Sequence, residues 1–179
     1  MHAQLEAIVS DFRSAGTRVH ALDRRLSPEA WLRRPSAESW SAAECVAHLN
    51  LTAEAMLPRF RTGLEEARRL GQPAPNVYRR DFVGWLIWKS LKPGGRMKTK
   101  TVASFVPTGD RAPREILADF DRLQADLIAV TRQSEGLPLH RVKMPSPFNE
   151  RARYNLYSAL TITAIHEHRH LLQAERVVS

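Results

Sequence analysis

The fold that the sequence predicts is decided by segment 154–177, YNLYSALTITAIHEHRHLLQAERV. Its length corresponds to roughly six or seven turns of α-helix. Steps of three and four residues trace one line along this helix, formed by Ala159, Thr163, His166, His170, Gln173 and Val177. We expect this line to face inward, so the segment needs other helices to pack against.

Three further segments show apolar residues at helical spacing. The first has a stripe of Leu5, Ile8, Phe12, Val19, Leu22 and Leu26. The second begins at Ser41-Ala42-Ala43-Glu44, the pattern of a capping box, and runs to about Leu70 with a bend expected near Pro58. The third begins at Pro113, ends at Gly136-Leu137-Pro138, and has a stripe of Ile116, Leu117, Phe120, Leu123, Leu127 and Val130.

Four long helices with one apolar face each bury those faces best against one another. The sequence therefore predicts an all-α four-helix bundle, formed as a single domain over residues 1–179 and without convincing strands. We expect residues 71–76 to form a loop, residues 92–111 a long irregular connection, and residues 144–147 another loop.

The composition and charge of the chain argue against several classes of protein. The formal net charge is +8, but the basic residues are scattered and no run of them reaches five, so nucleic-acid binding is the less favoured interpretation. Cys45 is the single cysteine, which excludes an intrachain disulfide and fits a reducing compartment. The first ten residues lack a signal-peptide pattern, and no apolar run approaches the roughly 20 residues that span a bilayer. We expect a cytoplasmic protein without a membrane partner.

Segment 82–91 predicts a short and very apolar helix. Core packing or a contact between two copies is a more common role for such a helix than binding to a membrane surface. Together with the outer faces of the long helices, it offers more hydrophobic surface than one bundle needs, so we expect a homodimer.

The last helix carries the run Ile165-His166-Glu167-His168-Arg169-His170. At about 100° per residue, His166 and His170 lie about 40° apart around the helix axis, so both rings can reach one metal ion. His168 lies about 160° from either ring and should point outward. Without an ion, two buried imidazoles would need partners for four ring nitrogens.

His48 is the candidate for a third ligand. It follows the capping box and falls near the apolar face of its helix, where a lone histidine is more often a core residue. The pair His166 and His170 on the last helix nevertheless favours a role for His48 as a metal ligand. Three protein ligands leave a position open to water or substrate, the pattern of catalytic rather than structural zinc sites. Imidazole also suits other divalent ions, so zinc, nickel, iron and manganese all remain candidates.

Other polar and aromatic residues have simpler interpretations, and no catalytic residue is assigned. We expect Cys45 to be a small buried side chain, Glu44 to act as a cap, and Glu167 to lie on the surface rather than to act as a base. Trp40, Trp85 and Trp88 could line a pocket, but packing in the core or at an interface is the favoured role for each. Reception of an anionic substrate by Arg153 and Tyr154 is only weakly indicated.

Trp40-Ser41-Ala42-Ala43-Glu44-Cys45-Val46-Ala47-His48-Leu49, paired with His166-x-x-x-His170-x-x-Gln173, resembles the DinB-like superfamily. That superfamily includes YfiT-type metal-dependent hydrolases and thiol S-transferases, and the resemblance spans nearly the whole chain. It implies a bundle in up-down-down-up order, often homodimeric, with a divalent metal on His48, His166 and His170. Some members use bacillithiol, mycothiol or glutathione as a co-substrate, and many have no known activity.

Two functions follow from this interpretation. The first is an enzyme, a metal-dependent thiol S-transferase or hydrolase that acts on a small molecule. The second is a non-catalytic metal-binding or interaction protein, because no residue compellingly suits proton transfer. The segments 71–76 and 92–111 match nothing that would identify a substrate.

Overall fold

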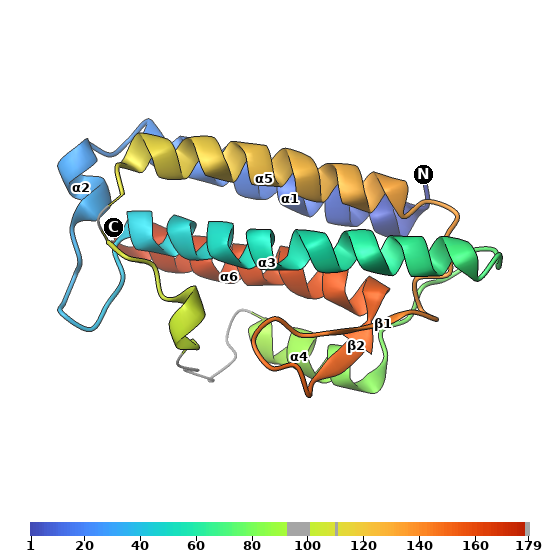
Figure 1. Cartoon of the computed structure of the whole chain (residues 1–179). Helices are drawn as coiled ribbons and strands as arrows, with labels where there is room; N and C mark the ends of the chain where they lie inside the picture. Colours follow the sequence, from blue (N-terminus) through green and yellow to red (C-terminus); the bar gives the residue numbers. More distant parts are fainter. Residues whose placement is uncertain (93–100, 110, 178–179) are drawn as a thin grey trace.

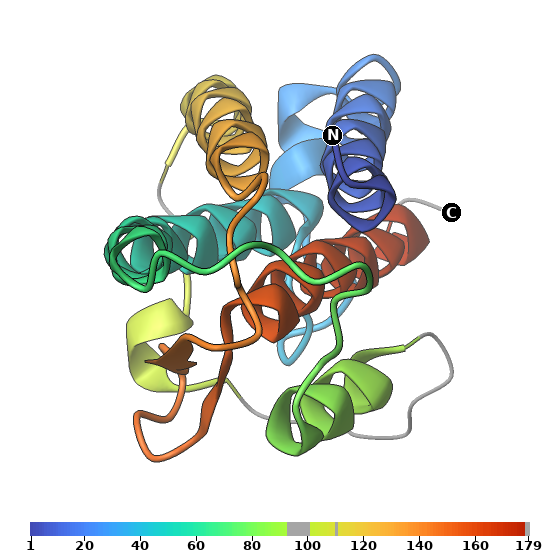
Figure 2. The same ribbon diagram turned by 90° about the vertical axis from the view of Figure 1, so that its right-hand side faces the viewer.

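Four long helices build the body of the protein in a computed structural model that describes residues 1–92, 101–109 and 111–177. They are α1 (Ala3–Asp23), α3 (Ala42–Arg69), α5 (Pro113–Gln133) and α6 (Leu156–Val177). In Figure 1, α1 and α6 run one way, and α3 and α5 run the other way. Figure 2 shows α1 and α5 lying over α3 and α6. The all-α bundle and its up-down-down-up order are confirmed.

Local signals in the sequence set where the helices begin and end. Ser41 Oγ accepts from the Glu44 backbone N–H at 3.1 Å, and the Glu44 carboxylate accepts from the Ser41 N–H at 2.8 Å. This confirms the capping box of α3. Ser27 caps the short helix α2 (Pro28–Leu32). Gly71 and Gly136 adopt positive φ just beyond α3 and α5, which a glycine does without steric cost.

The core runs the length of the bundle as two apolar clusters. One gathers around Phe12, Phe60 and Leu127, and the other around Trp31 and Phe120 near the start of α3. None of the helices within the described residues is long and apolar enough to cross a bilayer.

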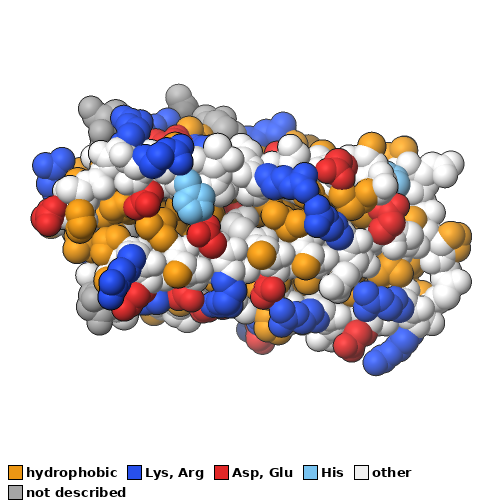
Figure 3. All heavy atoms as spheres, turned by 90° about the horizontal axis from the view of Figure 1, so that it is seen from above, with side chains coloured by type: hydrophobic (Ala, Val, Ile, Leu, Met, Phe, Trp, Pro, Cys, Tyr) orange, Lys and Arg blue, Asp and Glu red, His pale blue; other side chains and the backbone are white. Residues whose placement is uncertain are grey.

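Charged side chains of both signs alternate over the face formed by α1 and α5 (Figure 3). Arg122 lies 3.1 Å from Asp119 and 3.6 Å from Glu54, and Arg111 lies 2.7 Å from Asp119. This face therefore offers no continuous basic surface for a nucleic-acid backbone.

The start of α6 differs from the prediction. The sequence placed the last helix from Tyr154, but Arg153–Asn155 forms strand β2, which pairs antiparallel with β1 (Lys143–Pro145). The helix begins at Leu156, where Asn155 Oδ1 accepts from the Ser158 N–H at 2.8 Å, as an N-cap side chain does. Strands of three residues are too short to produce a readable alternation in the sequence.

The connection over residues 92–111 is only partly visible. Residues 93–100 and 110, which belong to the expected irregular connection, lie outside the described residues. Of the remainder, Ala103–Phe105 forms the 3-10 turn η1 rather than irregular chain.

Helix α4 (Phe82–Leu91) lies outside the four long helices and packs on α6 (Figures 1 and 2). Asp81 joins the two elements: its carboxylate accepts from the Gly84 N–H and the Asn155 N–H, both at 3.0 Å, and from Ser158 Oγ at 3.3 Å. Gly84 sits so close to α6 that a Cβ atom there would lie 2.2 Å from Ser158 Oγ.

This close approach gives a test of the fold with a matched control. We expect Gly84→Ala to lower the free energy of unfolding by about 1–3 kcal/mol, because the added methyl overpacks the α4–α6 contact. The same substitution at Gly16, in α1, meets nothing within 4 Å and should raise it by roughly 0.5–1 kcal/mol. Urea denaturation measures both changes, and equal shifts of the same sign would contradict the packing described.

Candidate metal centre

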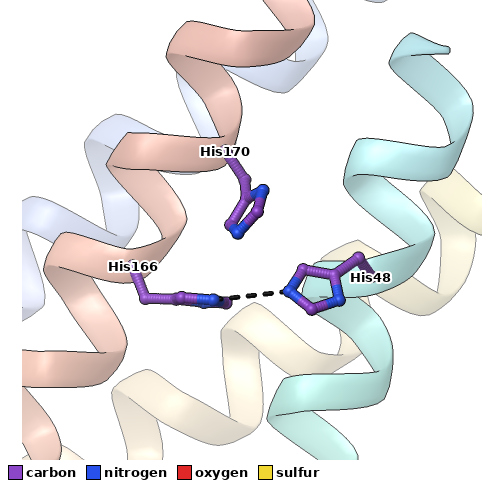
Figure 4. Close-up of side chains that lie close together, drawn as sticks. All are labelled: His48, His166 and His170. Atoms are coloured by element: carbon purple, nitrogen blue, oxygen red, sulfur yellow. Dashed lines mark hydrogen bonds between the residues drawn. The ribbon is translucent and has the colours of Figure 1, made fainter. Parts of the chain in front are cut away.

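The three predicted histidines meet between α3 and α6 (Figure 4). The capping box fixes the start of α3 and so places His48 in its second turn. His166 and His170 project from successive turns of α6, as expected for residues four apart on one helix face. Because α3 and α6 pack directly against each other, the three rings face one another.

The distances between the rings are on the scale of one metal ion. His48 Nε2 lies 3.3 Å from His166 Nε2, and one nitrogen from each histidine lies within 4.8 Å of the other two. Two nitrogens bound tetrahedrally to zinc at about 2.1 Å would lie roughly 3.4 Å apart. The ring centroids of His170 lie 4.5 Å from those of His48 and His166.

A hydrogen bond fixes the tautomer of His48. Its Nδ1 lies 2.8 Å from the carbonyl oxygen of Phe105, in η1. A carbonyl oxygen only accepts, so Nδ1 carries the proton and Nε2 of the neutral ring presents a lone pair to the cluster. Metal-binding histidines commonly donate their other ring N–H to an acceptor of this kind.

All three rings are held in the neutral form that binds metals. Burial is the main cause: it lowers the pKa of His48, sets the pKa of His166 well below 6.5, and lowers that of His170 to about 3. The neighbouring rings of the cluster lower the pKa values of His166 and His170 further.

The hydrogen bonding of the cluster also fits a metal ion. A hydrogen bond between His48 Nε2 and His166 Nε2 would share one proton between two rings. It would leave the third ring, His170, without a partner in the cluster. In the described part of the chain, Nδ1 of His166 and Nδ1 of His170 are buried without a hydrogen-bond partner. An ion on the facing nitrogens would give every ring one strong partner, which offsets the cost of burying three imidazoles.

Aromatic side chains surround the histidines. The Trp40 ring lies 4.9 Å from the ring of His48 and 5.9 Å from that of His170, so Trp40 lines the site in addition to packing. Phe148 lies 5.7 Å from the His166 ring and 4.4 Å from Phe105. Neither Phe105 nor Phe148 is predicted from the sequence as a site residue, because both lie in short segments without a repeating pattern.

Trp85 and Trp88 lie elsewhere, on α4. The Trp88 ring is packed beneath the Arg80 guanidinium at 3.9 Å, whereas Trp85 is 42% exposed. Trp85 is therefore not part of the core of this chain, and the alternative, packing at an interface, stays a prediction.

The residues beside the two α6 ligands point to other helices. His168 is directed away from the cluster, as predicted, but it meets α1, where its Nδ1 lies 2.9 Å from Arg18 Nη1, and not solvent. The surface position expected for Glu167 is wrong: its side chain is buried and accepts from Gln124 Nε2, in α5, at 2.7 Å. Burial raises the pKa of Glu167 to about 8.

Two further expectations concern residues outside the cluster. Cys45 is fully buried, as predicted, and burial raises the pKa of its thiol to about 12. Arg153 and Tyr154 do not form a joint anion site, because neighbouring side chains of strand β2 point to opposite faces. Tyr154 is buried, whereas Arg153 is exposed and donates to the carbonyl oxygen of Lys143.

The family model described as the DinB superfamily matches residues 11–174. The chain therefore belongs to the DinB superfamily. No curated protein and no solved structure matched the chain.

The geometry predicts how metal content responds to substitution. Purified protein loaded with zinc and then desalted should hold about one ion per chain. His48→Ala, His166→Ala and His170→Ala should each lose most of it, while His168→Ala should retain it because that ring faces α1. Elemental analysis measures the content. Retention by His166→Ala together with loss by His168→Ala would mean that the phase of α6 is wrong.

Burial of the neutral rings also predicts how stability depends on pH. Unfolded histidines titrate near pH 6.5, so below that pH the unfolded, metal-free chain binds more protons than the folded one, and the free energy of unfolding falls as pH falls. Between roughly pH 6 and pH 4, His170→Gln should reduce this slope by up to about 1.4 kcal/mol per pH unit. Urea denaturation at a series of pH values measures the slope, and unchanged slopes would contradict a buried neutral His170.

Proposed function

We propose that this protein is a metal-dependent enzyme of the DinB superfamily, with one divalent ion held on His48, His166 and His170. The convergence of three neutral imidazoles from two helices, at the distances that one ion requires, is the observation that supports this most strongly. Zinc, nickel, iron and manganese are the candidate ions.

The number of protein ligands supports a reactive rather than a purely structural centre. Within the described ranges, no cysteine, aspartate or glutamate joins the three histidines in the cluster. Three protein ligands leave at least one coordination position open. A divalent ion held by these residues would lower the pKa of a thiol or water molecule in that position and so would supply a nucleophile at neutral pH.

The surrounding residues would orient the ligands and restrict water. The Phe105 carbonyl holds the His48 ring with Nε2 toward the cluster. The rings of Trp40, Phe105 and Phe148 present apolar faces around the histidines, which favours an apolar substrate group and strengthens electrostatic interactions inside the site.

We favour transfer to a small thiol over hydrolysis. Activation of water is generally helped by a base, but the buried carboxylate nearest in sequence, Glu167, is bonded to Gln124 on α5. A thiol is more acidic than water, so on binding such an ion it would release its proton to solvent without needing a protein base. The same lack of a base supports the second candidate, a metal-binding protein without catalytic activity.

Thiol consumption distinguishes the two candidates. The protein, loaded in turn with each candidate ion, would be mixed with glutathione, bacillithiol or mycothiol and a panel of electrophiles. We expect metal-dependent loss of free thiol with at least one pair, lowered by more than about a hundredfold in His170→Ala and unchanged in His168→Ala. Full metal binding without turnover across the panel would instead favour the non-catalytic protein.

A further inference from the structure

Helix α4 presents two different sides. Gly84, Ile87, Trp88 and Leu91 lie on the side toward the core. The opposite side is exposed: the accessible fraction is 75% for Phe82, 36% for Val83, 42% for Trp85 and 52% for Leu86. Among the other exposed large apolar side chains of the described part, Leu32 and Leu70 stand alone on separate segments, whereas Val102 and Val106 flank η1.

The exposed residues form one stripe. Phe82, Trp85 and Leu86 are spaced by three and four residues, so they share a helix face, and Lys89 continues it by one turn. The rings of Phe82 and Trp85 stack with centroids 6.3 Å apart. A contiguous exposed apolar stripe of this kind usually marks an interaction site.

The charges around the stripe are basic. Lys89 Nζ lies 4.9 Å from the Trp85 ring centroid, and Lys92 Nζ lies 4.1 Å from that of Trp88. Asp81 is the only acidic residue in segment 77–92, and its carboxylate is engaged by Gly84, Asn155, Ser158 and Lys143. Within segment 77–92, the stripe therefore has a cationic border and no free carboxylate to balance it.

We propose that this outer face of α4, formed by Phe82, Val83, Trp85, Leu86, Lys89 and Lys92, docks on an anionic lipid bilayer. The apolar side chains would enter the boundary between headgroups and acyl chains, and the lysines would pair with lipid phosphates and carboxylates. Aromatic residues favour that boundary, and lysine side chains reach the headgroups from beside an apolar face.

The arrangement of charge distinguishes this partner from a second copy. A symmetric dimer through α4 would remove Lys89 and Lys92 of each chain from water at an interface where segment 77–92 offers no free carboxylate to pair with them, at an energetic cost. The apolar content of the sequence alone predicts a homodimer without a membrane partner. The positions of Lys89 and Lys92 beside the stripe are known only from the structure. This inference does not depend on the metal site.

Vesicle flotation of the full-length protein tests the inference. We expect the partition coefficient to be at least about tenfold higher for phosphatidylcholine vesicles containing phosphatidylserine than for phosphatidylcholine alone, and to fall with added salt. Phe82→Glu/Leu86→Glu should abolish binding, and Lys89→Ser/Lys92→Ser should weaken it by at least about tenfold. Leu32→Glu and Leu70→Glu place the same charge on other exposed apolar residues and should leave binding unchanged.

Three results would overturn the inference: no binding to anionic vesicles, equal binding to both kinds of vesicle, or a dimer in light scattering that Phe82→Glu/Leu86→Glu converts to monomer. Circular dichroism checks that the variants fold. If the glutamate variant does not fold, the lysine pair decides, because both side chains are exposed and removing their charge leaves the core intact.

Discussion

The contact between α3 and α6 sets the main constraint on this protein, because it brings together three imidazole rings, those of His48 and His166 buried and that of His170 partly buried, where apolar side chains would otherwise pack. A buried polar group without a partner costs on the order of 1–3 kcal/mol. His48 recovers part of that cost through the Phe105 carbonyl, whereas Nδ1 of His166 and Nδ1 of His170 have no partner within the described structure. An ion shared by the facing nitrogens would give each of the three rings one strong partner.

One turn of α6 shows how firmly the bundle holds this arrangement. His166 and His170 face α3, Glu167 bonds to Gln124 in α5, and His168 meets α1. Rotation of α6 about its axis would break contacts with three helices together. On the other side of the cluster, the capping box fixes the start of α3, and Trp40 immediately before it covers the rings. The aromatic side chain that covers the rings, the first residue of α3 and the ligand His48 thus all lie within ten consecutive residues.

Sequence periodicity was sufficient for the features that repeat along a helix. It gave the four long helices, the phase of His166 and His170, and, with the capping box, the place of His48. It failed where a position depends on a neighbour distant in the sequence. The burial of Glu167 requires Gln124, 43 residues away, and the site's contacts with Phe105 and Phe148 come from segments without a repeating pattern. Strands of three residues and the exposed side of α4 were likewise decided by packing, not by local sequence.

X-ray absorption at the zinc edge tests the central claim most directly, because it reports the atoms around the ion itself. Protein loaded with one equivalent of zinc should show a first shell of nitrogen and oxygen near ~2.0–2.1 Å and the outer-shell scattering of about three imidazole rings. A spectrum dominated by sulfur, or one without imidazole scattering, would contradict the three-histidine site.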